Sequence, residues 1–355
     1  MRACHISSAI LSAFLFTLAG RTQTLRQAAD KQGMLVSAAA RPYLLSEPAY
    51  AATLGREFNM LEPEDALKWA ALRPDEATYD FRQGDDLVRF AREHGMKVRG
   101  HCLVWDHSNP EWLALGHFNS QELSRLLREH ITHIMTHYAG QILAWDVINE
   151  ALDENGSLRD SIWYNQPGIG LAGQGTGYIE QVFRWAHAAD PQALLFYNDA
   201  EGEALNRKSD AIYALMKKFK KNGVPIDGVG LQLHVPLIDA DLSGIAANIA
   251  RLAALGLQIH ITELDVSLLL DKNGEARPED LTRQAETYRG IVRACLSNPG
   301  CTALQTWGFT DKYSWIGSHS HGARGQALPF DRMYRPKPAY RAVLEELSAG
   351  RPDSH

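Results

Sequence analysis

Residues 142–150 read ILAWDVINE, an apolar run that ends in an amide and a carboxylate, Asn149 and Glu150. A mostly apolar run of this length is typical of a strand that is buried on both faces, as in a parallel sheet. Seven similar runs occur along the chain. In order, the eight expected strands are 35–39, 58–61, 97–105, 142–148, 193–197, 228–233, 258–261 and 303–307.

Helical patterns separate these runs. Residues 85–95, DDLVRFAREHG, begin with acidic side chains, carry apolar residues three or four apart and end at a glycine; these are start and stop signals of a helix. Strands that alternate with helices predict a parallel sheet covered by helices, and eight such units favour a closed (β/α)8 TIM barrel over an open sheet. No GxGxxG motif follows the first strand, which argues against a dinucleotide-binding fold.

The composition is that of a folded protein. The 355 residues include 36 basic and 42 acidic side chains, giving a net charge of −6, and 45% are hydrophobic, which excludes disordered and collagen-like chains. Lysine and arginine form no run of five, so we expect no nucleic-acid partner. No linker or repeat divides residues 30–345. We therefore expect one catalytic domain over 24–347, a loose tail over 348–355, and a monomer.

The amino terminus predicts secretion. Arg2 precedes an apolar stretch, 6–19, that is too short to span a bilayer as a helix, and small side chains follow at Ala19 and Gly20. We expect residues 1–20 to be a signal peptide and the mature protein to be secreted or periplasmic, with no membrane contact after cleavage. An uncleaved anchor is the alternative.

The cysteine pattern depends on that prediction. Cys295 and Cys301 flank a Pro-Gly turn signal. In an oxidising compartment these two side chains would pair, whereas a reducing compartment would keep them as thiols. We predict the Cys295–Cys301 disulfide on the strength of the signal peptide, and we expect Cys102, within an apolar run, to be packing.

Three histidines, His130, His133 and His137, fall on one face of a predicted helix. No carboxylate or cysteine completes a ligand set on that helix, so we interpret them as structural rather than as zinc ligands. The sequence predicts neither a metal site nor a cofactor.

Polar and aromatic residues follow seven of the expected strands, at the end where barrel enzymes carry their active sites. Glu150 and Glu263 each come directly after a strongly apolar strand. Cleavage of a glycosidic bond needs such a pair: a neutral carboxyl protonates the leaving oxygen, and an ionised one attacks or stabilises the anomeric carbon. Tryptophans near these strand ends suit a sugar, whose ring offers an apolar C–H face.

Four motifs resemble those of the retaining endo-1,4-β-xylanases of glycoside hydrolase family 10, and the resemblance covers nearly the whole chain after the expected signal. They are RGHCLVW (99–105), WDVINE (145–150), ITELD (261–265) and WGFTDKYSW (307–315). The resemblance implies that the substrate is xylan or a xylo-oligosaccharide. It also implies that Glu150 is the general acid/base and that Glu263 is the nucleophile of a retaining hydrolysis.

The resemblance implies further roles around these two glutamates. Asn149 matches a residue that binds the 2-hydroxyl of the sugar, His234 one that supports the nucleophile, and Asp265 is expected to lie behind the residues that touch the sugar. The expected substrate-binding side chains are Glu64, Asp65, Lys68, His101, Trp105, Asn149, Gln232, His234, Trp307 and Trp315.

Three positions depart from the family pattern. Asp65 stands where the family commonly has asparagine, so an amide donor is replaced by an acceptor-only carboxylate. The usual His-Ser-Gln after Trp105 is Asp-His-Ser here, and Ala200 replaces a tyrosine. These departures predict an altered sugar preference. They leave open another retaining β-glycanase, or a xylosidase for short oligosaccharides, on the same barrel. A carbohydrate-binding barrel without catalysis would have lost one of the two glutamates.

Overall fold

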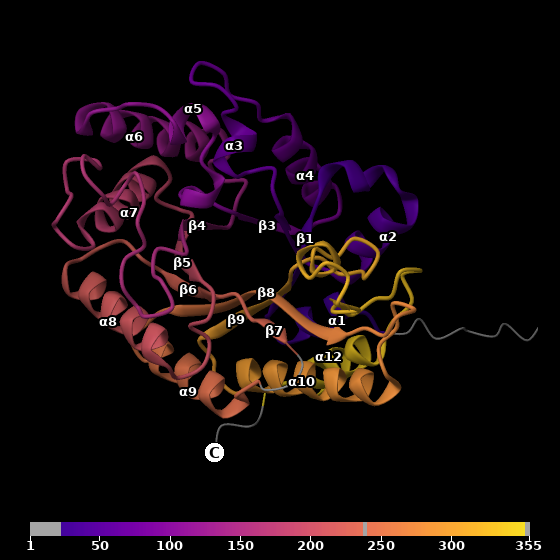
Figure 1. The fold of residues 1–355 in the computed structure, drawn as a ribbon. Coiled ribbons are helices and arrows are strands. Elements are labelled where there is room, and N and C mark those ends of the chain that lie inside the picture. Colours follow the sequence, from indigo (N-terminus) through magenta and orange to yellow (C-terminus); the bar gives the residue numbers. More distant parts are fainter. Residues whose placement is uncertain (1–22, 237–239, 352–355) are drawn as a thin grey trace, which may run out of the picture.

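Eight parallel strands close into a barrel in the computed structural model, which describes residues 23–236 and 240–351 (Figure 1). The strands are β1 (Leu35–Ala40), β2 (Met60–Pro63), β3 (Lys97–Gly100), β4 (Ala144–Asn149), β5 (Leu194–Asp199), β6 (Gly228–Leu231), β8 (Gln258–Leu269) and β9 (Cys301–Thr306). Each strand pairs in parallel with its neighbours, and the pairing of β8 with β9 closes the circle. The predicted (β/α)8 barrel is therefore confirmed.

Helices surround the barrel (Figure 1). The longer ones are α1 (Leu25–Lys31), α2 (Pro48–Glu57), α4 (Arg82–Glu93), α6 (Ser120–His137), α7 (Gly177–Ala189), α8 (Arg207–Lys221), α9 (Leu242–Ala253), α10 (Pro278–Leu296) and α12 (Pro338–Ala349). The short ones are α3 (Trp69–Leu72), α5 (Glu111–Ala114) and α11 (Ile316–His319). In α6, Asn119 and Glu122 form a capping box. Its leucines and isoleucines, three or four residues apart, are buried, so the local pattern is enough to form this helix.

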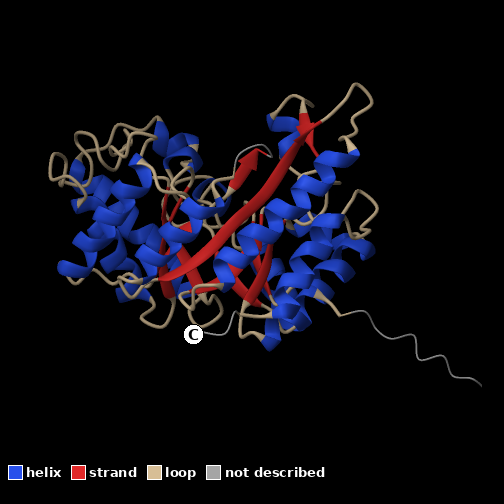
Figure 2. Ribbon diagram, turned by 90° about the horizontal axis from the view of Figure 1, so that it is seen from below, coloured by secondary structure: helices blue, strands red, loops and turns tan. Residues whose placement is uncertain are grey.

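The two strands that differ most in length from the prediction are β3 and β8. β3 ends at Gly100 rather than at Trp105, and beyond it only Val104 bridges back to β4. β8 continues to Leu269, and Figure 2 shows one strand extending well past the others. The extension exists because two short strands, β7 (His234–Pro236) and β10 (Arg324–Gly325), pair with its second half. Such partners lie too far away in sequence for a local pattern to reveal them.

The disulfide and the carboxyl terminus lie at the start of β9. Cys295, near the end of α10, is joined to Cys301, the first residue of β9, and Cys102 is buried and free. The expected loose tail begins too early at Ser348, because α12 continues to Ala349 and Arg351 donates hydrogen bonds to the carbonyl oxygens of Asn298 and Cys301.

The sequence also makes predictions about the amino terminus and membrane contact. The expected signal peptide, residues 1–20, lies outside the described residues. Within the described part of the chain, no helix combines the length and the apolar character needed to cross a membrane.

Candidate active site

The carboxyl ends of β4 and β8 bring two glutamates into one network of amides. The Nε2 of Gln232 donates to Glu150 Oε1 over 2.9 Å, and the Nδ2 of Asn198 lies 2.8 Å from Glu263 Oε1. The same Asn198 amide lies 2.9 Å from the Oδ1 of Asn149, which in turn lies 3.3 Å from Gln232 Nε2. Glu150 and Glu263, 113 positions apart in sequence, thus face a common set of donors.

Glu263 is buried and held as an anion. Only 4% of the residue is exposed, and burial alone would raise the pKa of its carboxyl. The hydrogen bond from His234, the positive charges of His101 and His234, and the bond from Asn198 outweigh burial and lower this pKa below its ordinary value. The side chain is therefore ionised at neutral pH, as a nucleophile must be.

His234 sits between two carboxylates. Its Nε2 lies 3.1 Å from Glu263 Oε2, and its Nδ1 lies 2.9 Å from the Oδ2 of Asp265, which also accepts the indole N–H of Trp315 over 2.9 Å. Burial lowers the pKa of His234, but the charge of Asp265 and the two hydrogen bonds raise it to about 10. As an imidazolium, His234 donates on both sides, so Asp265 acts on the site through His234.

Glu150 is in a more open position. The indole N–H of Trp105 donates to its Oε2 over 3.1 Å, and its backbone adopts a left-handed conformation with φ of 55°. A cavity of about 330 Å³ adjoins the side chain. Its lining includes Trp105, Asp106, His107, Asp153, Arg159 and Tyr178. A carboxyl that is held by neutral donors and faces such a space can exchange a proton with a bound molecule.

Lys68 lies between two tryptophans. Its Nζ is 5.0 Å from the ring centroid of Trp105 and 5.7 Å from that of Trp307. Burial lowers the pKa of Lys68, but its ion pair with Asp65, 2.7 Å away, raises it above the ordinary value. The carboxylate of Asp65, one of the departures from the family pattern, is therefore already engaged by a neighbour.

Glu64 is paired as well. Its Oε1 lies 2.5 Å from an Nη2 of Arg41, a residue just after β1. Burial raises the pKa of Glu64 despite this partner. The two carboxylates that follow β2 are thus bound to two different cations, Arg41 and Lys68.

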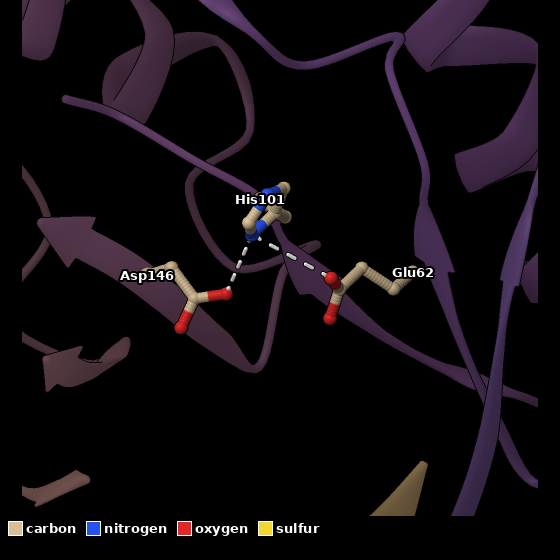
Figure 3. Close-up of side chains that lie close together, drawn as sticks. All are labelled: Glu62, His101 and Asp146. Atoms are coloured by element: carbon tan, nitrogen blue, oxygen red, sulfur yellow. Dashed lines mark hydrogen bonds and ion pairs between the residues drawn. The ribbon is translucent and has the colours of Figure 1, made fainter. Parts of the chain in front are cut away.

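A buried cluster of charges lies beneath His101 (Figure 3). Its Nδ1 is 3.0 Å from Asp146 Oδ2 and 3.6 Å from Glu62 Oε1. Arg99 contacts the same two carboxylates, with Nε 3.3 Å from Glu62 and 3.2 Å from Asp146. Among the described residues, Glu62, His101 and Asp146 form the one group whose ligand atoms lie close enough to surround a metal ion. Arg99 already supplies the positive charge there, so we assign no metal.

The three histidines of α6 have separate surroundings. The ring of His130 stacks on Trp69 with centroids 3.6 Å apart, and that of His133 stacks on Tyr79 at 4.2 Å. His137 lies 2.8 Å from a carboxylate oxygen of α4. Each ring has its own packing partner on the outer side of the barrel.

All the residues that the sequence singled out for the site fall within this set of contacts. Sequence reasoning missed Asn198, which lies at the end of an expected strand but was given no role, and it missed Glu62, Arg99 and Asp146. A charged side chain inside an expected apolar strand is the signal that could have found Arg99 and Asp146, because such a residue needs a buried partner. Glu62 directly follows the expected strand 58–61.

Comparisons with known proteins agree on one family. The model of glycosyl hydrolase family 10 matches residues 24–346. The chain is 40% identical over 324 residues to endo-1,4-beta-xylanase B of Thermotoga neapolitana, covering 90% of both chains. It is 34% identical over 306 residues to endo-1,4-beta-xylanase of Agaricus bisporus, covering 86% of this chain and 88% of that one. The crystal structure of xylanase 10B from Thermotoga petrophila RKU-1 in complex with xylobiose is similar at a TM-score of 0.88 and 39% identity, over 93% of this chain and 98% of that one.

Proposed function

The chain belongs to glycosyl hydrolase family 10, and from that premise we propose that it is an endo-1,4-β-xylanase that hydrolyses internal bonds of xylan with retention of anomeric configuration. One observation carries the proposal most directly. Glu150 and Glu263 share a network of amides but have different surroundings, because Glu263 is buried beside an imidazolium whereas Glu150 faces a cavity. That difference suits two carboxyls with opposite tasks.

In the first step, an oxygen of Glu263 attacks the anomeric carbon while the bond from that carbon to the glycosidic oxygen breaks. Glu150 gives its proton to the departing oxygen, so the leaving chain departs as an alcohol. The product is a covalent xylosyl-enzyme ester on Glu263. Trp105 and Gln232, which donate to the two oxygens of Glu150, hold that carboxyl in one orientation.

In the second step, Glu150 takes a proton from water, whose oxygen attacks the anomeric carbon, and the ester bond to Glu263 breaks. Two successive inversions give net retention. His234 remains a donor to Glu263, which stabilises the negative charge that returns to this carboxylate. Asn149, 2.9 Å from Asn198, is assigned to the 2-hydroxyl of the sugar, a bond that strengthens in the transition state.

The substrate-binding residues of the sequence analysis keep their proposed roles. Lys68, His101 and Gln232 bind the sugar on the non-reducing side of the bond. Trp105, Trp307 and Trp315 wall the site, with His234 and the ring of Trp315 at a centroid distance of 5.0 Å.

We also propose that the protein is a monomer that works outside the cytoplasm. The Cys295–Cys301 disulfide supports this location, because such bonds persist in oxidising compartments.

The test is the time course of products from unsubstituted xylan, glucuronoxylan and carboxymethyl cellulose. A Glu263→Gln preparation purified in parallel shows whether any activity comes from a contaminant. We expect a ladder of oligosaccharides early from both xylans and none from the cellulose. Release of xylose alone would contradict endo-cleavage, and inactivity of the folded protein on all three polymers would contradict the substrate.

A further inference from the structure

Two buried carboxylates converge on the same ring nitrogen of His101, and Figure 3 shows the other ring nitrogen on the far side. Asp146 and Glu62 come from β4 and β2, the two strands that flank β3 in the barrel. Asp146, His101 and Glu62 are each no more than 2% exposed. Water therefore contributes little to this cluster, and its protons are set by the charges within it.

This arrangement determines what the outward nitrogen can do. An ionised carboxylate only accepts hydrogen bonds, so Nδ1 of His101 must carry a hydrogen to face Asp146 at 3.0 Å. If the ring is neutral, Nε2 then has no hydrogen and is an acceptor. If the ring is doubly protonated, Nε2 is a charged donor. The charge on His101 thus decides the kind of hydrogen bond that it offers a sugar.

Asp146 alone does not stabilise the positive charge of a doubly protonated His101. Arg99 contacts both oxygens of Asp146, through Nε at 3.2 Å and through a close Nη2 contact, so the negative charge of Asp146 is largely neutralised by Arg99. The second negative charge is that of Glu62, whose Oε2 also accepts from Gln305 Nε2 over 2.5 Å. With Glu62 ionised, two anions balance two cations. Without it, a doubly protonated His101 would leave one buried positive charge uncompensated.

We propose that Glu62, once ionised, is a positioning residue that keeps His101 doubly protonated into the alkaline range, so that Nε2 continues to donate a charge-assisted hydrogen bond to the substrate there. The inference deepens the proposed xylanase function and rests on it for the identity of the substrate. Glu62 itself touches no sugar and acts through His101.

The other charged and titratable groups around the pair are accounted for. Those that act on His101 and Glu62 are Arg99 and Cys102 on the β3 side, Asp146 on β4, Glu263 on β8 and Lys68 after β2, with His260 of β8 beyond Arg99. Burial raises the pKa of Cys102 and lowers that of His260, so both are neutral near pH 7.

The order in which the pair loses its protons follows from these neighbours. Burial raises the pKa of Glu62 to about 8, although the charges of His101 and Arg99 oppose the rise. Burial lowers the pKa of His101, but the hydrogen bond to Asp146 and the charge of Glu62 raise it well above its ordinary value. Once one proton is lost, Arg99 favours the charge on Glu62 and Asp146 favours the charge on His101. Glu62 therefore ionises first and then holds the proton on His101.

The direct test is a pH titration of His101 by long-range ¹H–¹⁵N NMR in histidine-labelled protein, with the signal assigned by a His101→Asn variant. In the wild type, we expect both ring nitrogens to remain protonated beyond pH 8. In Glu62→Gln, we expect the ring to lose its charge at a pH lower by about 1–3 units, the usual effect of losing an opposite charge at this range.

The functional test uses 2,4-dinitrophenyl β-xylobioside, whose leaving group needs no proton, so that proton transfer from Glu150 does not limit the rate. At pH 6 we expect kcat/KM of Glu62→Gln to stay near the wild-type value. At pH 9 we expect it to be about tenfold lower, as for the loss of one hydrogen bond to a charged group. Glu62→Asp, which keeps the charge, is expected to restore most of the alkaline activity.

A matched control is Glu57→Gln. Glu57 is 4% exposed and accepts hydrogen bonds from Leu25 N, the hydroxyl of Tyr340 and Nε of Arg56, but it lies on α2, outside the barrel. The same substitution there should lower stability without moving the pH profile. Melting curves at pH 6 show which variants are folded.

The outcomes separate the two levels of the proposal. Wild-type protein that does not cleave the xylobioside would contradict the proposed function, while the NMR titration would still test Glu62. An active wild type whose His101 titration and alkaline limb are unchanged in Glu62→Gln would overturn the role of Glu62. If Glu62→Gln does not fold, a wild-type His101 that loses its charge as Glu62 ionises, near pH 8, would overturn it equally.

Discussion

His234 and Glu263 face each other across 3.1 Å, from Nε2 to Oε2, on strands that are paired only beyond the end of the barrel. β7 carries His234 and pairs with the second half of β8, just after Glu263. The long β8 thus presents both the carboxylate and, through β7, the cation that keeps it ionised. This pairing has consequences for the nucleophile and for stability.

Removing the nucleophile should abolish turnover and leave a cavity that a small anion can enter. We expect Glu263→Ala to lose about four to six orders of magnitude in kcat on an aryl xylobioside. Azide should restore part of the rate and give the α-glycosyl azide, of inverted configuration, because only one displacement takes place. NMR of the product identifies its configuration. Turnover near the wild-type level without azide would contradict the assignment.

Removing the acid/base should have a different signature. Glu150→Ala should lose activity on xylan but still form the glycosyl-enzyme from 2,4-dinitrophenyl β-xylobioside, whose leaving group is stable without a proton. We expect a burst of dinitrophenol followed by slow turnover, and azide should accelerate the turnover and give the β-glycosyl azide. Stopped-flow absorbance and product NMR measure both effects. An α-product would assign the residue to the other role.

His234 should make stability depend on pH. Its pKa is about 10 in the folded protein and about 6.5 in an unfolded chain, so the folded state binds more protons between these values. The stabilisation is complete below about pH 6.5 and is lost as the pH rises to about 10. Urea unfolding at pH 6, 8 and 10 should show a smaller fall in unfolding free energy for His234→Gln than for the wild type. Equal slopes would show that His234 gains no proton on folding.

The ion pair of Asp65 and Lys68 should influence sugar binding. Asp65→Asn would release Lys68, 2.7 Å away, and supply an amide donor beside it. We expect KM for xylotetraose to fall by about 2–10-fold, the effect of one additional hydrogen bond, while kcat changes little. Steady-state kinetics with Asp75→Asn, an exposed carboxylate outside the site, provides the comparison. An unchanged KM would mean that Asp65 does not contact the substrate.

The disulfide should contribute stability but not catalysis. Cys295 and Cys301 are six positions apart, so the bond closes a short loop, and chain entropy predicts a stabilisation of about 2 kcal/mol. Cys295→Ala/Cys301→Ala should lower the unfolding free energy by about that amount or somewhat more, because both side chains are buried. kcat at 25 °C should be unchanged, since Cys301 begins β9 at the end of the barrel opposite to the site. Loss of kcat in folded protein would contradict this separation.

The sequence by itself determined the barrel and the two glutamates. Mostly apolar runs such as 142–148 indicate burial on both faces, and helix signals such as the capping box of Asn119 act within a few residues. Glu150 and Glu263 stand out because they directly follow such runs, and the position of a residue at the end of a strand is a local property.

Only the tertiary structure decided which side chains meet. Asn198 joins Glu263 to Asn149 across 65 and 49 positions, and Arg99 joins Glu62 to Asp146 beneath His101. These side-chain contacts depend on strand register, because a shift of one residue would turn each side chain to the other face of the sheet. The protonation of His234 and His101 depends in turn on those neighbours, because burial and nearby charges set a pKa. The local sequence around these histidines reveals neither their burial nor the charges that face them.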